Sequence, residues 1–431
     1  MARFDSLALL RNREFAALAG SAFARSQAYS TILIALALYA DLFGTTGFVE
    51  GLFGTTFALV QLVVVVPLGR RIDAGNAKRW LLYGFLLNVA VFIGFILVSN
   101  AVHVILVRML QGLGASTLWI TGATVVGQIS PDADQGRWLG AYNQVGALSS
   151  MAGDLVGGYL LFAYGFVIPY LVLTAITLGA FVLVWVALRD DPGGRPDPDS
   201  ESGIAALRSL LALPMLRALI GFRFAFSFGK MAVIIFLPIY ARTSFGLSAF
   251  VIGWILAGGK LTKALAQGYV GGLTDRWGHR RHFVAAGAGL YGVGTAMIPL
   301  AGVLEGAIPA IHLSVLGGTQ TLGGAFLALF VAYALLGIAD SLRLPASMSL
   351  FVDEGEREDS VASAMSLRSL SWKGGQVAGP VAVGVVMDAF GVTSGFILAA
   401  GFVGVATAGF VIAARRAHAA RSGMTGAARA D

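Results

Sequence analysis

Cysteine is absent from the 431 residues, and charged residues are scarce. Without cysteine there can be no disulfide, no thiolate metal site and no thiol redox chemistry. Charged residues make up 12% of the chain, whereas a soluble domain carries about 25%. With 57% hydrophobic residues and a mean hydropathy of +0.79, the composition excludes an ordinary soluble domain and indicates an integral membrane protein.

A nucleotide-binding P-loop is also missing, so direct ATP drive is not expected. We therefore predict a protein that is not an enzyme and that needs neither a cofactor nor a metal. The net charge of +7 would suit a nucleic-acid partner, but the distribution of the cations gives it another meaning.

Long apolar runs dominate what is present. A helical span needs about 20 mainly apolar residues, and the chain contains twelve such runs. The first follows Arg11 and Arg13 and has no cleavage signature, which indicates a retained helix rather than a signal peptide. The runs lie near 14–39, 48–69, 80–99, 101–126, 138–162, 166–188, 216–240, 248–273, 283–302, 324–350, 361–387 and 393–414.

The cations between these runs set the topology. If the N-terminus is cytoplasmic, 20 of the 30 lysines and arginines lie in cytoplasmic segments and only Arg242 lies on the opposite side. By the positive-inside rule both termini are cytoplasmic, in a multi-pass protein of the cytoplasmic (inner) membrane.

The segment RDDPGGRPDPDSESG at 189–203 is polar and rich in Pro, Gly and Asp, which is typical of a flexible linker. The apolar residues that follow at helical spacing suit either a short interfacial helix or a lead-in to the seventh span. The predicted domains are a first six-helix bundle (1–188), a cytoplasmic linker (189–213), a second six-helix bundle (214–414) and a cytoplasmic tail (415–431).

The two halves repeat at an offset near 202, as shown by the pairs Gly69 with Gly271 and Asp73 with Asp275. We therefore predict an all-α membrane protein with twelve transmembrane helices, in two six-helix bundles related by a pseudo-twofold axis along the membrane normal. In such an architecture the binding site lies between the halves near the midplane, and alternating access moves the substrate.

Two cationic segments occupy matching places in the repeat, GRRIDAGNAKR from Gly69 and GGLTDRWGHRR from Gly271. They resemble motif A of the major facilitator superfamily, Gly-x-x-x-Asp-Arg-x-Gly-x-Arg/Lys-Arg/Lys. The first copy has Ala74 in place of Arg and its next glycine one place early, at Gly75. The second copy matches at Gly271, Asp275, Arg276, Gly278 and Arg280.

Two further segments extend this resemblance. RMLQGLGAS resembles motif B from Arg108 onward, and GDLVGG resembles the end of motif C with Asp154 in place of proline. Motif C is typical of the drug:proton antiporter branches, so the resemblance implies a major facilitator fold and export. The Asp154 substitution leaves the direction open.

The motif A aspartates suggest a gate, because a carboxylate is favoured beside a helix N-terminus. Asp73 and Asp275 are expected at cytoplasmic helix ends, where such contacts would latch that side shut. The alternative is a role in topology alone. The predicted gating residues are Gly69, Asp73, Gly271, Asp275 and Arg276.

Nine cations fall within the spans, against two clearly buried acids, Asp154 and Asp340. Ionisable residues in spans face the bundle interior or a water-filled cavity, so the interior is expected to be electropositive and to bind an anion. Four of the five lysines are in spans but only five of the 25 arginines: Arg25, Arg108, Arg223, Arg343 and Arg368. Because a desolvated lysine can lose its proton, this bias suggests a switchable charge.

The predicted substrate-binding residues are Arg25, Tyr29, Arg108, Lys230, Lys260, Lys263, Arg368, Trp372 and Lys373, and the predicted proton carriers are Asp154 and Asp340. Several alternatives stay open. Arg223 could snorkel to the interface, Arg343 could pair with Asp340, and Arg108 could serve the architecture or proton coupling. Asp154 could instead neutralise Lys260 or Lys263.

These residues predict a monomeric secondary active transporter for a small organic anion, with proton-coupled efflux as the first interpretation. An anion uptake symporter or an anion exchanger is the alternative. A sensor that transports nothing, or a lipid scramblase, is the alternative from another class.

Overall fold

A computed structural model describes residues 8–131, 134–190, 210–278, 280–315, 318–357 and 360–427. Within them, twelve long helices overlap all twelve predicted spans, so the prediction of an all-helical membrane protein is confirmed. The first half contributes α2 (Arg13–Phe43), α3 (Gly47–Ala74), α4 (Ala77–Ile96), α5 (Ala101–Ile129), α6 (Gln135–Tyr164) and α7 (Val167–Ala187). The second half contributes α9 (Pro214–Phe245), α10 (Ala249–Trp277), α11 (Arg280–Met297), α13 (Gly324–Glu356), α14 (Val361–Phe390) and α15 (Val392–Ala427).

Ten of these helices are long and apolar enough to cross a membrane, among the described residues. The two exceptions are α11, whose 18 residues begin with Arg280 and Arg281, and α14, which carries Arg368 and Lys373. In α14 the cations lower the hydropathy at positions that we predicted to be functional.

Local chemistry explains several helix ends. The side chain of Asn12 accepts hydrogen bonds from the backbone N–H groups of Glu14 and Phe15 and so caps the start of α2. Gly44 ends the same helix with a φ of 54°, a left-handed conformation that a side chain would strain. Gly278, the motif A glycine after α10, has a φ of 63° for the same reason.

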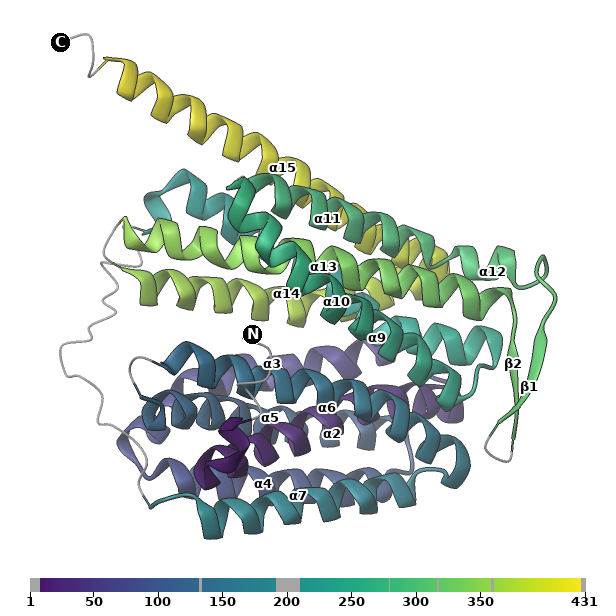
Figure 1. The fold of residues 1–431 in the computed structure, drawn as a ribbon. Helices are drawn as coiled ribbons and strands as arrows, with labels where there is room; N and C mark the ends of the chain where they lie inside the picture. Colours follow the sequence, from purple (N-terminus) through teal and green to yellow (C-terminus); the bar gives the residue numbers. More distant parts are fainter. Residues whose placement is uncertain are drawn as a thin grey trace. The chain divides into compact units, whose positions relative to one another are not determined.

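The chain divides into two compact units. The first comprises Met1–Asp199, Pro238–Ala257 and His312–Leu322, and the second comprises Ser200–Leu237, Gly258–Ile311 and Gly323–Asp431. In the first unit, Tyr39 on α2 donates a hydrogen bond to the Phe95 carbonyl and stacks on Phe166, with ring centroids 4.2 Å apart. In the second unit, α11 lies against α13 and α15 (Figure 1).

The internal repeat is visible in how helices cross. On α6, a Cβ at Gly153 would lie 2.6 Å from the Gln27 carbonyl oxygen of α2. On α14, a Cβ at Gly375 would lie 2.3 Å from the Phe224 carbonyl oxygen of α9. Thus the fifth helix of each half crosses the first at backbone distance, as small residues allow in membrane proteins.

Three elements between α11 and α13 were not predicted. They are the short helix α12 (Leu300–Leu304) and the strands β1 (Ile311–Val315) and β2 (Gly318–Leu322), which pair as a hairpin. Hydropathy carries no signal for such short elements outside the spans. The predicted interfacial helix after the linker lies largely outside the described residues, because they omit 191–209.

Candidate functional site

A buried carboxylate, Asp340 on α13, is surrounded by three cations from three helices. Lys230 on α9 and Lys263 on α10 both donate to its Oδ2 atom, and the Lys263 Nζ lies 3.2 Å away. Arg343, one turn along α13, donates from Nη2 to Oδ1 at 3.0 Å. The predicted pairing of Arg343 with Asp340 is confirmed, and the structure adds the two lysines to it.

Glycine packing brings two of these helices close enough for the contact. A Cβ at Gly337 on α13 would lie 2.1 Å from the Gly259 carbonyl oxygen on α10. Beside this crossing, the Thr262 hydroxyl donates to the Ala334 carbonyl at 2.9 Å. Lys263 follows Thr262 directly, so the close crossing sets the lysine within reach of the carboxylate.

The four side chains differ in how much solvent they contact. Arg343 and Asp340 are 1% and 5% exposed, whereas Lys230 is 17% and Lys263 is 32% exposed. Three cations around one carboxylate leave an excess of positive charge, and buried charges are stable only when compensated. The two lysines are therefore the accessible members of an electropositive group, while Arg343 forms its ion pair with the carboxylate out of contact with solvent.

Aromatic rings line the same group. The Arg343 guanidinium carbon lies 3.7 Å from the ring centroid of Phe226, and the Lys230 Nζ lies 5.7 Å from that of Tyr291. Such cation–π contacts partly replace the lost hydration of the cations. Sequence reasoning missed Phe226 and Tyr291, since an aromatic residue in an apolar span carries no distinguishing signal.

Arg223 and Arg368 form a second cationic group in the same unit. Arg223 is 6% exposed, donates from Nε to the Arg368 carbonyl at 2.9 Å, and stands over the Trp372 ring at 4.7 Å. Its side chain therefore does not snorkel to the interface, contrary to the alternative that the sequence allowed for Arg223. Arg223 thus contacts both Arg368 and Trp372, which lie four residues apart on α14.

In the first unit, Arg108 on α5 is 1% exposed and forms hydrogen bonds within the protein. Its Nε donates to the Phe53 carbonyl at 2.7 Å and its Nη1 donates to Gln111 at 2.6 Å. Its guanidinium also lies 4.2 Å from the Phe57 ring centroid, which in turn lies 5.7 Å from that of Tyr29. These contacts favour the architectural interpretation of Arg108.

Arg25 on α2 has a different neighbour, the indole of Trp119 on α5, at 4.1 Å. Trp119 is 62% exposed, so this cation–π pair lies at an open face of the first unit. Asp154 is fully buried on α6, and Lys260 and Lys373 are half-buried. The ion pair formed by Lys263 is with Asp340, while a pairing of Asp154 with a lysine stays a prediction.

The predicted gate is described only in part. Gly69 has open space around it, and Arg276 is exposed near the end of α10. The side chains of Asp73, Gly271 and Asp275 lie outside the described residues, so their role as a latch stays a prediction.

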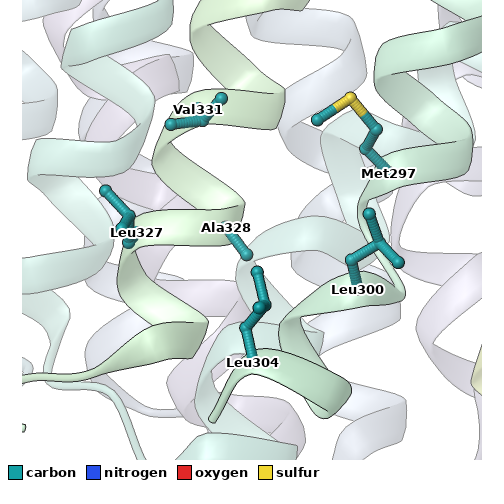
Figure 2. Close-up of a pocket in the computed structure, with 6 residues that line it drawn as sticks. All are labelled: Met297, Leu300, Leu304, Leu327, Ala328 and Val331. Carbon is teal, nitrogen blue, oxygen red and sulfur yellow. The ribbon is translucent and has the colours of Figure 1, made fainter. Parts of the chain in front are cut away.

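A pocket of about 190 Å³ is lined by none of these charged residues (Figure 2). It opens between α11, α12 and α13 and is lined by Met297, Leu300, Leu304, Leu327, Ala328 and Val331. Since the lining is entirely apolar, this pocket offers no group that would bind an ion.

Long apolar helices that hold clustered ionised side chains define an integral membrane protein of the kind that moves solutes. The family model of the Major Facilitator Superfamily matches residues 18–228 and again 219–429. The chain belongs to that superfamily, and the two matches confirm the internal repeat. It is a transporter and not an enzyme, as the sequence predicts.

Individual relatives are distant. An uncharacterized MFS-type transporter of Methanocaldococcus jannaschii is 21% identical over 85% of this chain and 89% of its own length. The class B tetracycline resistance protein of Escherichia coli is 22% identical over 53% of this chain and 58% of its own. A bacterial homolog of the human lysosomal transporter Spinster shares the fold, with a TM-score of 0.73 and 16% identity over 93% of this chain and 96% of its own.

Proposed function

We propose that this protein transports a small organic anion across the cytoplasmic membrane by alternating access, coupled to protons. It acts as a monomer with both termini in the cytoplasm. The observation that carries the proposal is the group around Asp340, in which Lys230 and Lys263 share a single carboxylate oxygen. An incoming anion can replace Asp340 as the partner of one or both lysines, because a carboxylate or phosphate of the substrate accepts hydrogen bonds from the same ammonium groups.

The remaining predicted residues supply supporting contacts. Lys260 and Lys373 add positive charge on α10 and α14, and Tyr29 and Arg25 offer a phenol and a guanidinium on α2. Trp372 provides a ring face for an organic part of the substrate. Arg108 is the exception, because its hydrogen bonds to the Phe53 carbonyl and to Gln111 favour a role in the architecture rather than in substrate binding.

Proton-coupled efflux is the direction that we propose first. It is supported by the likeness to motif C and by a relative whose name is tetracycline resistance protein. Asp154 and Asp340 are the carboxylates available to carry the proton, the first as a fully buried group on α6.

A second candidate, proton–anion symport, is favoured by the contacts of Asp340. Protonating this carboxylate would release Lys230 and Lys263, leaving them to bind an anion. Proton and anion would then bind together, which is the sign of coupling that a symporter needs. Antiport requires the opposite sign, with the proton and the substrate competing.

The test is flux in proteoliposomes with an imposed pH gradient, using a panel of radiolabelled carboxylates and organophosphates. Antiport predicts anion movement against the direction of the proton gradient, and symport predicts movement along it. Asp340→Asn should abolish the effect of the gradient in either case, with Asp190→Asn outside the spans as the control. Transport of cationic or neutral compounds in preference to anions would refute the anion proposal.

A further inference from the structure

The group formed by Arg223 and Arg368 differs from the Asp340 group in that no described carboxylate forms an ion pair with it. Among the described residues, neither guanidinium forms an ion pair, and Arg223 Nη1 and Arg368 Nε are buried without a hydrogen-bond partner. A buried arginine ordinarily has its donors satisfied, because an unpaired charge in a low-dielectric site is costly. Two adjacent arginines with unused donors therefore indicate a place for an anion from outside the chain.

The backbone around this pair is held in place. The Arg368 carbonyl accepts from Arg223 Nε at 2.9 Å and from the Ser371 hydroxyl at 3.0 Å. One turn further along, the Ser227 hydroxyl donates to the Trp372 carbonyl at 2.7 Å. Since α9 and α14 also cross at backbone distance, the unused donors are presented by a rigid frame, which a binding site requires.

The two cationic groups are connected through α9. Arg223 precedes Lys230 by seven residues, which is two turns of one helix face and places their Cα atoms about 10 Å apart along the axis. Guanidinium groups suit bidentate binding of a carboxylate or phosphate, whereas the lysines at Asp340 act as compact point charges. Among the described residues, the lysine group thus has a carboxylate in its ion pairs, and the arginine group does not.

We propose that Arg223 and Arg368 form a second anion subsite and that the substrate is a dianion, with one acidic group at this subsite and the other at Lys230 and Lys263. This inference rests on the proposed transport of an organic anion and specifies its class. The two acidic groups of such a substrate are separated by an organic spacer that spans the two turns of α9 between the subsites, about 10 Å between the Cα atoms of Arg223 and Lys230. The Trp372 ring lies beside the arginine end, where it contacts that spacer.

The experiment is calorimetric titration of the purified full-length protein in detergent. The probes are straight-chain α,ω-dicarboxylates of four to ten carbons, each compared with the monocarboxylate of the same length. We expect one of the longer dicarboxylates to bind at least about tenfold more tightly than its monocarboxylate, the gain from one additional charged hydrogen-bonded contact. The measured quantity is this ratio of affinities.

Arg223→Gln should bring the ratio close to one, because it removes the contact that the second acidic group gains. Arg368→Gln should act in the same way, and it preserves the Arg368 carbonyl that ties α14 to Arg223. If Arg223→Gln does not fold, Arg368→Gln alone decides the matter. Arg415→Gln, at an exposed arginine in the C-terminal half of α15, is the control and should leave the ratio unchanged.

Three results would count against the second subsite. A ratio near one in the unmodified protein, or a ratio that both variants leave unchanged, overturns it while monocarboxylate binding keeps the proposed function intact. Failure of every mono- and dicarboxylate to bind overturns the subsite and the proposed anion transport together.

Discussion

Lys263 on α10 lies 3.2 Å from the Asp340 carboxylate on α13, although 77 residues separate them in the chain. The contact depends on two glycines, Gly259 and Gly337, that let these helices touch at backbone distance. The ion pair between Lys263 and Asp340 thus depends on helix packing at two uncharged residues.

Removing the central carboxylate should be costly. Asp340→Asn leaves three cations facing each other, and loss of one partner of a buried ion pair typically destabilises by about 3 to 5 kcal/mol. We expect a lower thermal unfolding temperature in detergent. The double variant Asp340→Asn/Arg343→Met removes a charge of each sign and should recover part of that loss. An unchanged unfolding temperature in Asp340→Asn would show that the carboxylate is not the stabilising counter-charge.

The two lysines should differ in their effects on stability but not on binding. Lys230→Gln and Lys263→Gln should each weaken anion binding by about tenfold, since each removes one charged hydrogen bond. Lys263 is the more exposed of the two, so its substitution should lower the unfolding temperature less. Lys78→Gln, at an ion pair with Asp190 outside the spans, serves as the control for binding. Anion affinity unaffected by both variants would remove the lysines from the binding site.

Helix packing provides a test that involves no charge. Gly337→Ala should destabilise by about 1 to 3 kcal/mol, the usual cost of overpacking, because its Cβ would lie 2.1 Å from the Gly259 carbonyl oxygen. Gly289→Ala on α11 is the matched control, since a Cβ there meets nothing within 4 Å. Alanine in a helix interior should be neutral or stabilising at that position. Equal unfolding temperatures for the two variants would argue against the close crossing of α10 and α13.

Arg108 should act on stability rather than on substrate affinity. Arg108→Gln loses the hydrogen bonds to the Phe53 carbonyl and to Gln111, each worth about 1.5 to 3 kcal/mol for a charged donor. We expect a lower unfolding temperature with an unchanged anion dissociation constant for the protein that remains folded. The opposite pattern, with affinity lost and stability kept, would restore the role in substrate binding that the sequence predicts for it.

Much of the fold could be predicted because the signals are local. The bilayer requires each spanning helix to be apolar over its own length, so every span could be located from its own residues. The repeat could also be recognised from the sequence, and so could the motif A glycine Gly278. Glycine is needed at this position because other residues rarely adopt its φ of 63°. The hairpin of β1 and β2 was missed, since short strands outside the membrane are subject to no such requirement.

The candidate site was predictable to a lesser degree. Arg343 and Asp340 are three residues apart on one helix, and that pairing could be read from spacing. The partners of Lys230 and Lys263 come from another helix, and no periodicity indicates which acid they meet. Arg223 illustrates the same limit, because its contact with Arg368 spans 145 residues.

The sequence by itself determined that this protein crosses the membrane repeatedly, that its halves are copies, and that its spans carry more positive than negative charge. Only the tertiary structure decided that a single carboxylate forms ion pairs with three cations, and that no carboxylate among the described residues forms one with Arg223 or Arg368. The physical reason is that hydropathy acts on each segment separately, whereas an ion pair between helices depends on the distance and rotation at which their backbones cross.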